Sequence, residues 1–169
     1  MADRANGDAH EGSVPSESGP DAQAGEPVVE QLEEAECLRL ISAGGVGRLA
    51  YSGRFGPVVI PVNYKLHQGA IVFRTALGSP MDEDLRTGIA GAEYQVAFEI
   101  DEIDMAAREG WNVLIQGSAH HVDSEAERAS LVRAGVEPWV GGHRELFVRV
   151  LPSRITGRRI RRAGGSASG

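Results

Sequence analysis

With 169 residues, 24 acidic and 17 basic side chains and a formal net charge of −7, the chain is long enough for one domain with a substantial core. Its charge is uneven, because residues 1–36 hold ten acids and one arginine, whereas residues 149–169 hold six arginines and no acid. The chain has no basic stripe interleaved with aromatics, no apolar run long enough to span a bilayer and a single cysteine, which argues against a nucleic-acid binder, a membrane-spanning protein and a disulfide scaffold.

The N-terminal segment is mostly Ala, Gly, Ser, Pro, Asp and Glu and offers almost nothing to bury. Such a composition cannot offset the entropy lost on ordering, so residues 1–28 are predicted to be a disordered acidic arm. The arm lacks the basic start and apolar stretch of a secretory signal, so a cytoplasmic protein is expected. Residues 163–169, which are mostly Gly and Ser, are predicted to be a disordered tail.

The segment from Glu30 to Ser42 is predicted to form an amphipathic helix, which ends at the glycine pair 44–45. Its apolar residues recur at helical spacing: Leu32, Ala35, Leu38 and Ile41. The lone cysteine, Cys37, is interpreted as a small apolar residue of this helix rather than as a reactive thiol.

Six β-rich runs follow and are predicted as strands. They cover residues 46–52, 57–64, 70–75, 94–101, 111–122 and 145–151, and a short basic segment follows at 154–160. The polar connection 65–69 marks a hairpin, Gly117 predicts a bulge, and the run 94–101 is apolar enough to be buried on both faces. Because most runs follow one another without a helix long enough for a parallel crossover, the sheet is predicted to be mainly antiparallel and to form a closed or partly closed barrel with flanking helices.

Two short helices are predicted between these strands, one capped by Ser79 with Pro80 as its first residue, the other capped by Ser124. Arg74 and Thr75 end the strand that precedes Ser79. An arginine fork, two hydroxyls and the free N–H groups of a helix start suit a small anion. The alternative interpretation is an edge-strand arginine in water and an ordinary helix cap, which the motif alone favours because short anion motifs are common by chance.

No other constellation in the sequence predicts a catalytic or metal site. His120 and His121 are adjacent on a predicted strand, so they point to opposite faces and cannot chelate one ion together. No Gly-x-Ser-x-Gly motif occurs, and no Gly-x-Gly-x-x-Gly motif follows a strand. No catalytic residue is predicted, and any chemistry would be that of a bound cofactor.

Several fragments, in order along the chain, are typical of one protein family. They are Glu36–Ile41, Val46–Ala50, Pro61–Tyr64, Ile71–Thr75, Val96–Asp101, Gly110–Leu114 and Pro138-Trp139. Their order and spacing resemble the flavin-binding split-barrel proteins of the pyridoxamine 5′-phosphate oxidase-like superfamily, and more narrowly its short actinobacterial-type members described as FMN-binding. The match covers about residues 30–162.

This resemblance implies a six-stranded antiparallel split β-barrel, mainly β with flanking helices, that forms a homodimer with FMN at the subunit interface. By position, the cofactor-binding residues would be Val59, Ile60, Pro61, Val62, Asn63, Arg74, Thr75, Ser79, Asn112 and Trp139. The first five would run along the isoalloxazine ring and the next three would bind the phosphate. The last two would lie near the ring, with the asparagine often contributed by the other subunit.

The chain departs from the family at the phosphate loop. Family members usually carry Lys after the Ser or Thr of this loop, whereas this chain has Pro80, with acids at 82–84. The missing cation removes a contact worth about 1.5–3 kcal/mol, and the acids repel an incoming phosphate. Arg74 is then expected to be the main phosphate cation, with no second cation to compensate for it.

The function implied by the resemblance is an FMN-dependent oxidoreductase that acts on a small organic molecule. A second hypothesis is a non-catalytic dimeric binding protein that keeps the barrel and binds flavin weakly or not at all. A third is a split barrel that holds a deazaflavin or haem in the same groove. No nucleic-acid or membrane partner is expected under any of the three.

Overall fold

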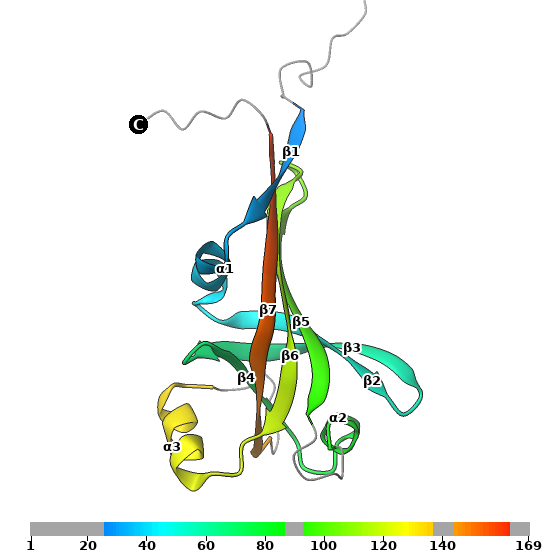
Figure 1. Cartoon of the computed structure of the whole chain (residues 1–169), viewed down its shortest axis with the longest axis vertical. Coiled ribbons are helices and arrows are strands. Elements are labelled where there is room, and N and C mark those ends of the chain that lie inside the picture. Colours follow the sequence, from blue (N-terminus) through cyan, green and yellow to red (C-terminus); the bar gives the residue numbers. More distant parts are fainter. Residues whose placement is uncertain (1–25, 87–92, 137–143, 163–169) are drawn as a thin grey trace, which may run out of the picture.

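The computed structural model describes residues 26–86, 93–136 and 144–162 (Figure 1). Residues 1–25 of the predicted arm, the predicted tail 163–169 and Trp139 lie outside these residues, whereas Pro27 and Val28, predicted as part of the arm 1–28, belong to the first strand. The strands are β1 (Pro27–Leu32), β2 (Gly45–Gly53), β3 (Gly56–His67), β4 (Ala70–Thr75), β5 (Tyr94–Asp104), β6 (Glu109–His121) and β7 (Leu146–Arg162). The helices are α1 (Glu34–Ile41), α2 (Pro80–Asp84) and α3 (Glu125–Arg133).

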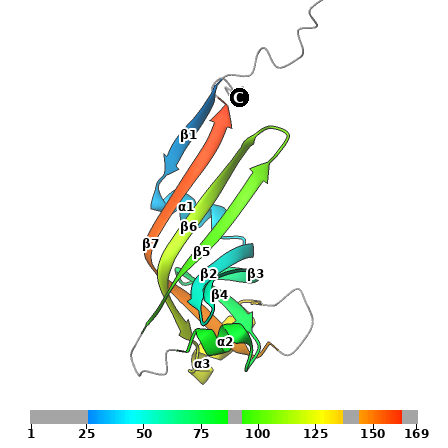
Figure 2. The same ribbon diagram turned by 90° about the vertical axis from the view of Figure 1, so that its right-hand side faces the viewer.

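The strands form one antiparallel sheet in the order β1-β7-β4-β3-β2-β5-β6, and β6 also pairs with β7. This last pairing closes six of the strands into a barrel, and β1 is added to the C-terminal half of β7 (Figure 2). The predicted mainly-β, antiparallel six-stranded split barrel is therefore confirmed, with a seventh strand outside the ring.

The first correction concerns the N-terminal end of the domain. The helix predicted from Glu30 begins at Glu34, because residues 27–32 pair instead with β7, from Pro27 opposite Arg162 to Leu32 opposite Gly157. A distant strand edge thus satisfies backbone groups that the local pattern assigned to a helix. The helix buries Cys37 and Ile41 rather than Ala35, and Cys37 behaves as the predicted small apolar residue.

The second correction concerns β7, which is one strand where a strand at 145–151 and a separate basic segment were predicted. Its continuity follows from β6, which pairs with it from Gly110 to His121. The ladder shifts register between Gln116 and Gly117, so the predicted bulge is confirmed. A Cβ at Gly117 would collide with the carbonyl oxygen of Leu151, and only glycine fits this close approach.

The barrel interior is filled by alternate residues of the strands, among them Leu49, Phe73, Phe98, Ile115 and Val150. β5 buries one face only, with Val96, Phe98 and Ile100 inside, so the prediction that it is buried on both faces is wrong. The wall is split between β3 and β4, since these strands pair only from Tyr64–His67 to Ala70–Phe73. Beyond this short ladder the earlier part of β3 stays with β2 and the end of β4 stays with β7.

Candidate functional site

A cavity of about 610 Å³ lies in the split between β3 and β4 and is closed at its base by α2. Its apolar wall includes Tyr51, Val58, Ile60, Val62 and Met81. Its polar end is formed where β4 stops, by Arg74, Thr75 and Ser79. Six of the predicted cofactor-binding residues line this one cavity: Ile60, Pro61, Val62, Arg74, Thr75 and Ser79.

Three other predicted residues that the structure describes lie elsewhere. Val59 of β3 does not line this cavity, and 63% of its surface is exposed. Asn63 lines a smaller hollow with Gly44 and Lys65. Asn112 lies on β6 opposite Arg158 of β7, which pairs on its other side with β1, and it does not line this cavity. A single copy of the chain therefore does not bring Asn112 to the cavity.

The polar end of the cavity is a short loop between β4 and α2. Ser79 caps α2 as predicted, since its Oγ accepts a hydrogen bond from the Asp82 backbone N–H at 3.2 Å, and Pro80 is the first helical residue. The same Oγ lies 3.0 Å from Oγ1 of Thr75, which is buried. Gly78 has φ 70°, a conformation that residues with a Cβ rarely adopt. The loop thus holds two hydroxyls side by side at the cavity.

Arg74 is half-buried and is not the water-exposed arginine of the alternative interpretation. Its guanidinium lies over the Phe147 ring, 4.8 Å from the ring centre. Its Nε is buried and has no hydrogen-bond partner among the described residues. A buried N–H without a partner costs free energy, which an anion at the cavity would recover. The residues present therefore fit a phosphate group at this end.

The acids of α2 do not leave the cavity strongly negative. Arg54, from the β2–β3 turn, forms ion pairs with Glu83 and with Asp84. Arg86 Nε donates to Asp82 Oδ1 at 2.8 Å. Burial alone would raise the pKa of Asp82, but the Gly78 N–H and Arg86 outweigh it and hold the pKa below its ordinary value. The expected repulsion of a phosphate is thus offset by neighbouring arginines.

A second cation, Arg144, lines the same cavity, so the expectation that none could support Arg74 is wrong. It precedes β7, and β7 pairs with β4 so that Leu146 lies opposite Thr75. Strands were predicted at 70–75 and 145–151, but no local signal indicated that they pair, so Arg144 was not placed at the site. Phe147, which supports the Arg74 guanidinium, comes to the site through the same pairing.

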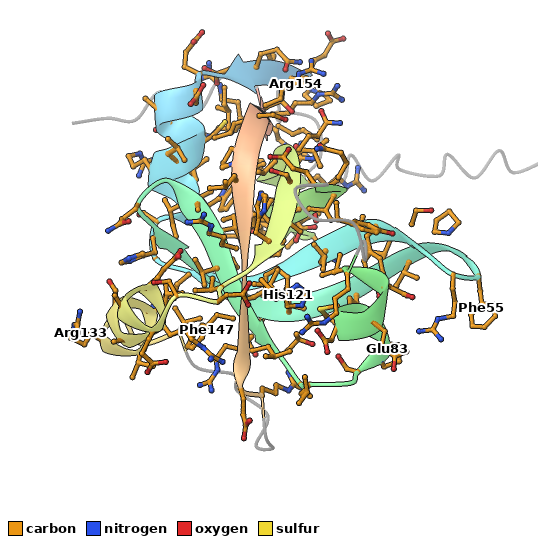
Figure 3. The ribbon with its side chains drawn as sticks, turned by 60° about the horizontal axis from the view of Figure 1, so that its bottom comes forward. Phe55, Glu83, His121, Arg133, Phe147 and Arg154 are labelled. Atoms are coloured by element: carbon orange, nitrogen blue, oxygen red, sulfur yellow. The ribbon has the colours of Figure 1, made fainter. Side chains whose placement is uncertain are left out.

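His121 is the remaining residue that sequence reasoning did not place here. Figure 3 shows it near the centre of this end of the barrel, between α2 and α3 and close to Phe147. Its Nε2 lies 2.8 Å from Asp82 Oδ1. Burial, and then Arg86, lowers the pKa of His121, with Asp82 acting in the opposite direction. The imidazole is therefore neutral at neutral pH.

The cavity offers a long apolar wall and one anion-binding end, but little acid–base chemistry of its own. Its described lining contains neither histidine nor cysteine, and its acids Glu83 and Asp84 are paired with an arginine. Across the described residues, no three His, Cys, Asp or Glu side chains gather in a metal-binding group. No helix in these parts of the chain has the length and apolar character needed to cross a membrane.

Comparison with known proteins places the chain among related sequences and structures. The family model described as pyridoxamine 5′-phosphate oxidase matches residues 33–159. An uncharacterized protein of Mycobacterium tuberculosis, Rv0080, is 32% identical over 138 residues, which cover 82% of this chain and 89% of that protein. The FAD binding protein from Mycobacterium smegmatis is 32% identical, with a TM-score of 0.65 over 78% of this chain and 100% of that chain. A FAD-binding protein from Mesorhizobium loti shares the fold at 23% identity, with a TM-score of 0.62 over 80% of this chain and 98% of that chain.

Proposed function

Because the chain belongs to the pyridoxamine 5′-phosphate oxidase-like split-barrel family, we propose that it binds a flavin nucleotide, FMN, in the cavity between β3 and β4 and acts as an oxidoreductase on a small organic molecule. The observation that carries the proposal is the polar end of this cavity. The buried Arg74 Nε lacks a partner among the described residues, and the hydroxyls of Thr75 and Ser79, 3.0 Å apart, line the same cavity as Arg74.

The roles of the residues follow from their chemistry. Arg74, Arg144, Thr75 and Ser79 hold the phosphate by charge and hydrogen bonds, and the apolar wall holds the ring. A bound flavin supplies hydride or electron transfer, and the chain binds it, orients it and excludes water. The family's missing lysine is replaced in this assignment by Arg144, which reaches the cavity from another part of the sequence.

FAD is the second candidate ligand, and a second hollow favours it. This hollow, about 490 Å³, shares Arg74 with the first and continues along α3 past Arg128 and Arg133. A dinucleotide has a second phosphate and an adenosine, and the three arginines of this hollow, set against Glu125 and Glu145, can accept them. The Mycobacterium smegmatis relative at 32% identity is itself named as FAD binding.

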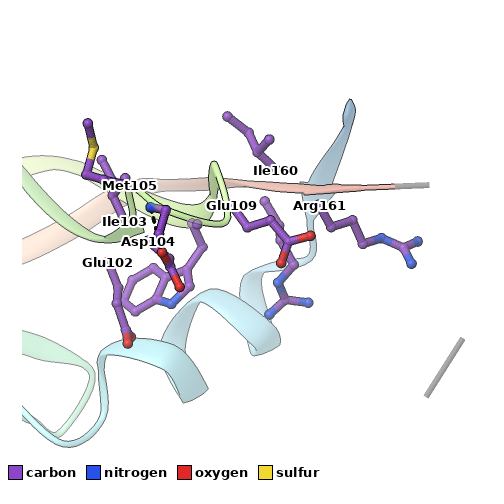
Figure 4. A pocket seen from close by; sticks show the side chains of 11 residues that line it. Glu102, Ile103, Asp104, Met105, Glu109, Ile160 and Arg161 are labelled. Atoms are coloured by element: carbon purple, nitrogen blue, oxygen red, sulfur yellow. Dashed lines mark hydrogen bonds between the residues drawn. The ribbon is translucent and has the colours of Figure 1, made fainter. Parts of the chain in front are cut away.

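A homodimer is the third part of the proposal, and the end of the barrel opposite α2 supports it. One row of apolar side chains crosses β1, β7 and β5 there, with Val29 60%, Ile160 44% and Ile103 61% exposed. These three side chains border a hollow of about 620 Å³ that Asn112 also lines. A neighbouring hollow, which shares Ile103 and Ile160 with the first, is shown in Figure 4. A second copy that covers this face buries the row and brings Asn112 toward the partner's cavity.

The flavin assignment is tested by titrating purified apo protein with FMN, FAD and riboflavin and following flavin fluorescence. Tight binding of FMN with weak binding of riboflavin supports a phosphate site, whereas tighter binding of FAD than of FMN selects the second candidate. The visible spectrum of the protein as purified distinguishes a flavin from haem. A colourless protein that binds none of the three flavins contradicts the proposal.

The homodimer is tested by light scattering of the parent and of Ile103→Asp, which places a charge in the exposed apolar row. We expect a dimer for the parent and a shift toward monomer for the variant. Val132→Asp is the matched control, since Val132 is an equally exposed apolar residue on α3 (64%). A monomeric parent, with or without flavin, contradicts the two-subunit site.

A further inference from the structure

The loop between β4 and α2 is held by one buried carboxylate. Asp82 is 2% exposed although it lies on a surface helix of five residues. Its Oδ2 accepts a hydrogen bond from the Gly78 backbone N–H at 2.8 Å, and its Oδ1 accepts one from Arg86 Nε at 2.8 Å. The backbone N–H of Asp82 donates to Ser79 Oγ at 3.2 Å. Asp82 therefore forms hydrogen bonds with the loop at two residues, Gly78 and Ser79.

Packing gives this loop little support, so its shape depends on these polar contacts. Leu77 is 70% exposed, and a Cβ at Gly78 would meet no atom within 4 Å. Gly78 also adopts φ 70°, one of several conformations open to glycine. The Ser79 backbone N–H also donates to the Ala76 carbonyl oxygen at 3.2 Å and closes the turn, and the carboxylate adds the restraint on the Gly78 N–H itself.

His121 connects this carboxylate to the barrel, because it lies on β6 opposite Val148 of β7. Its Nε2 is 2.8 Å from Asp82 Oδ1, yet it makes no aligned hydrogen bond. The contact is thus a close polar one rather than an aligned hydrogen bond. A neutral His121, a charged Asp82 and a charged Arg86 sum to zero, and the group adds no net charge behind the anion site.

We propose that Asp82 is a positioning residue for the phosphate-binding loop: held by Arg86 and His121, it fixes Gly78 and Ser79 so that the Ser79 and Thr75 hydroxyls face a bound phosphate. The ligand part of this inference rests on the proposed flavin function. The loop part stands on the hydrogen bonds alone. An acid at this place in the loop thus orders the anion site instead of repelling the anion.

The test uses Asp82→Asn in the full-length protein, because this change keeps the size of the side chain and removes the charge and one acceptor oxygen. Losing one charge-assisted contact predicts an affinity for FMN that is lower by about tenfold. Riboflavin lacks the phosphate, so its affinity stays unchanged. Hydrogen exchange of the Gly78 amide, measured by NMR without ligand, becomes faster. Asp123→Asn is the matched control, since it makes the same chemical change at an exposed acid near His121 that does not touch the loop.

Each result decides the proposal. A selective loss for FMN with faster Gly78 exchange supports it, whereas equal losses for FMN and riboflavin, or no loss for either, overturn it. If the parent binds no flavin, the proposed function fails on its own, and the exchange rate of Gly78 alone decides the positioning role. If Asp82→Asn does not fold, Arg86→Gln takes its place, because the half-exposed Arg86 supports the same carboxylate; the same selective loss is expected, and its absence overturns the proposal.

Discussion

Asp82 and Glu36 lie at opposite ends of the barrel, and each carboxylate contacts two basic side chains. Glu36, on α1, binds Arg39 and Arg159 at 2.7 Å, with 29% of its side chain exposed. Asp82, beside the cavity, contacts Arg86 and His121 at 2.8 Å, with 3% of its side chain exposed. The buried carboxylate also holds a backbone amide, which Glu36 does not. The exposed carboxylate thus forms surface ion pairs, whereas the buried one also restrains the backbone.

The largest effect should come from removing the two carboxylates in turn. Asp82→Ala leaves the Gly78 N–H without its acceptor and removes the buried carboxylate that Arg86 and His121 contact, and we expect the free energy of unfolding to fall by about 2–4 kcal/mol. Glu36→Ala frees two side chains that water can solvate, so its effect should be clearly smaller. Urea denaturation of both variants measures the difference, and equal losses would show that burial does not separate the two sites.

The next largest effect is on FMN affinity, through the arginines at the polar end of the cavity. Arg74→Ala should weaken FMN binding by about 1.5–3 kcal/mol, because it removes a charge-assisted contact to the phosphate while Arg144 remains. Arg144→Ala should weaken it less, and the double variant more than either. Arg39→Ala, at the other end of the barrel, is the control and should bind FMN as the parent does. Parent-like FMN affinity in Arg74→Ala would place the phosphate elsewhere.

A smaller gain is expected when the family's lysine is restored. Pro80→Lys should strengthen FMN binding by about 1 kcal/mol, since the new cation lies at the rim of the cavity and is screened by water. Riboflavin binding should not change. In the Arg144→Ala background the gain should be larger, because the two cations then no longer share one phosphate. Fluorescence titration of the four proteins measures this coupling, and a strictly additive result argues that Arg144 does not contact the phosphate.

The smallest effect is the pH dependence of stability at the Glu36 end. Hydrogen bonds from Arg39 and Arg159 lower the pKa of Glu36 from its ordinary 4.5 to about 2. A carboxyl group whose pKa is lower in the folded state contributes stability that is complete above pH 4.5 and disappears as the pH falls toward about 2. Glu36→Gln should therefore show a shallower loss of stability across this window. Urea midpoints of variant and parent across the acid range test it, and parallel curves would contradict it.

The candidate site shows how far local patterns reach. Thr75 and Ser79 were predicted as neighbours because a strand end and a helix cap are separated by a fixed, short loop. The Ser79 cap, Pro80 at the helix start and the Gly117 bulge also follow from spacing over a few residues, and the structure confirms them. Arg144, Phe147 and His121 join the site through strand pairings. A pairing partner far along the chain leaves no mark in the local sequence.

The sequence by itself determined the fold class, the family and the residues that end β4 and begin α2, because side-chain alternation and capping are set by nearby residues. The tertiary structure alone decided that residues 27–32 form a strand, that β7 is continuous, and that a buried Asp82 holds the loop. These features depend on which strand edges meet and in what register. Register arises from the packing of the whole barrel, since a strand can offer its hydrogen bonds to any free edge and only the closed core selects one.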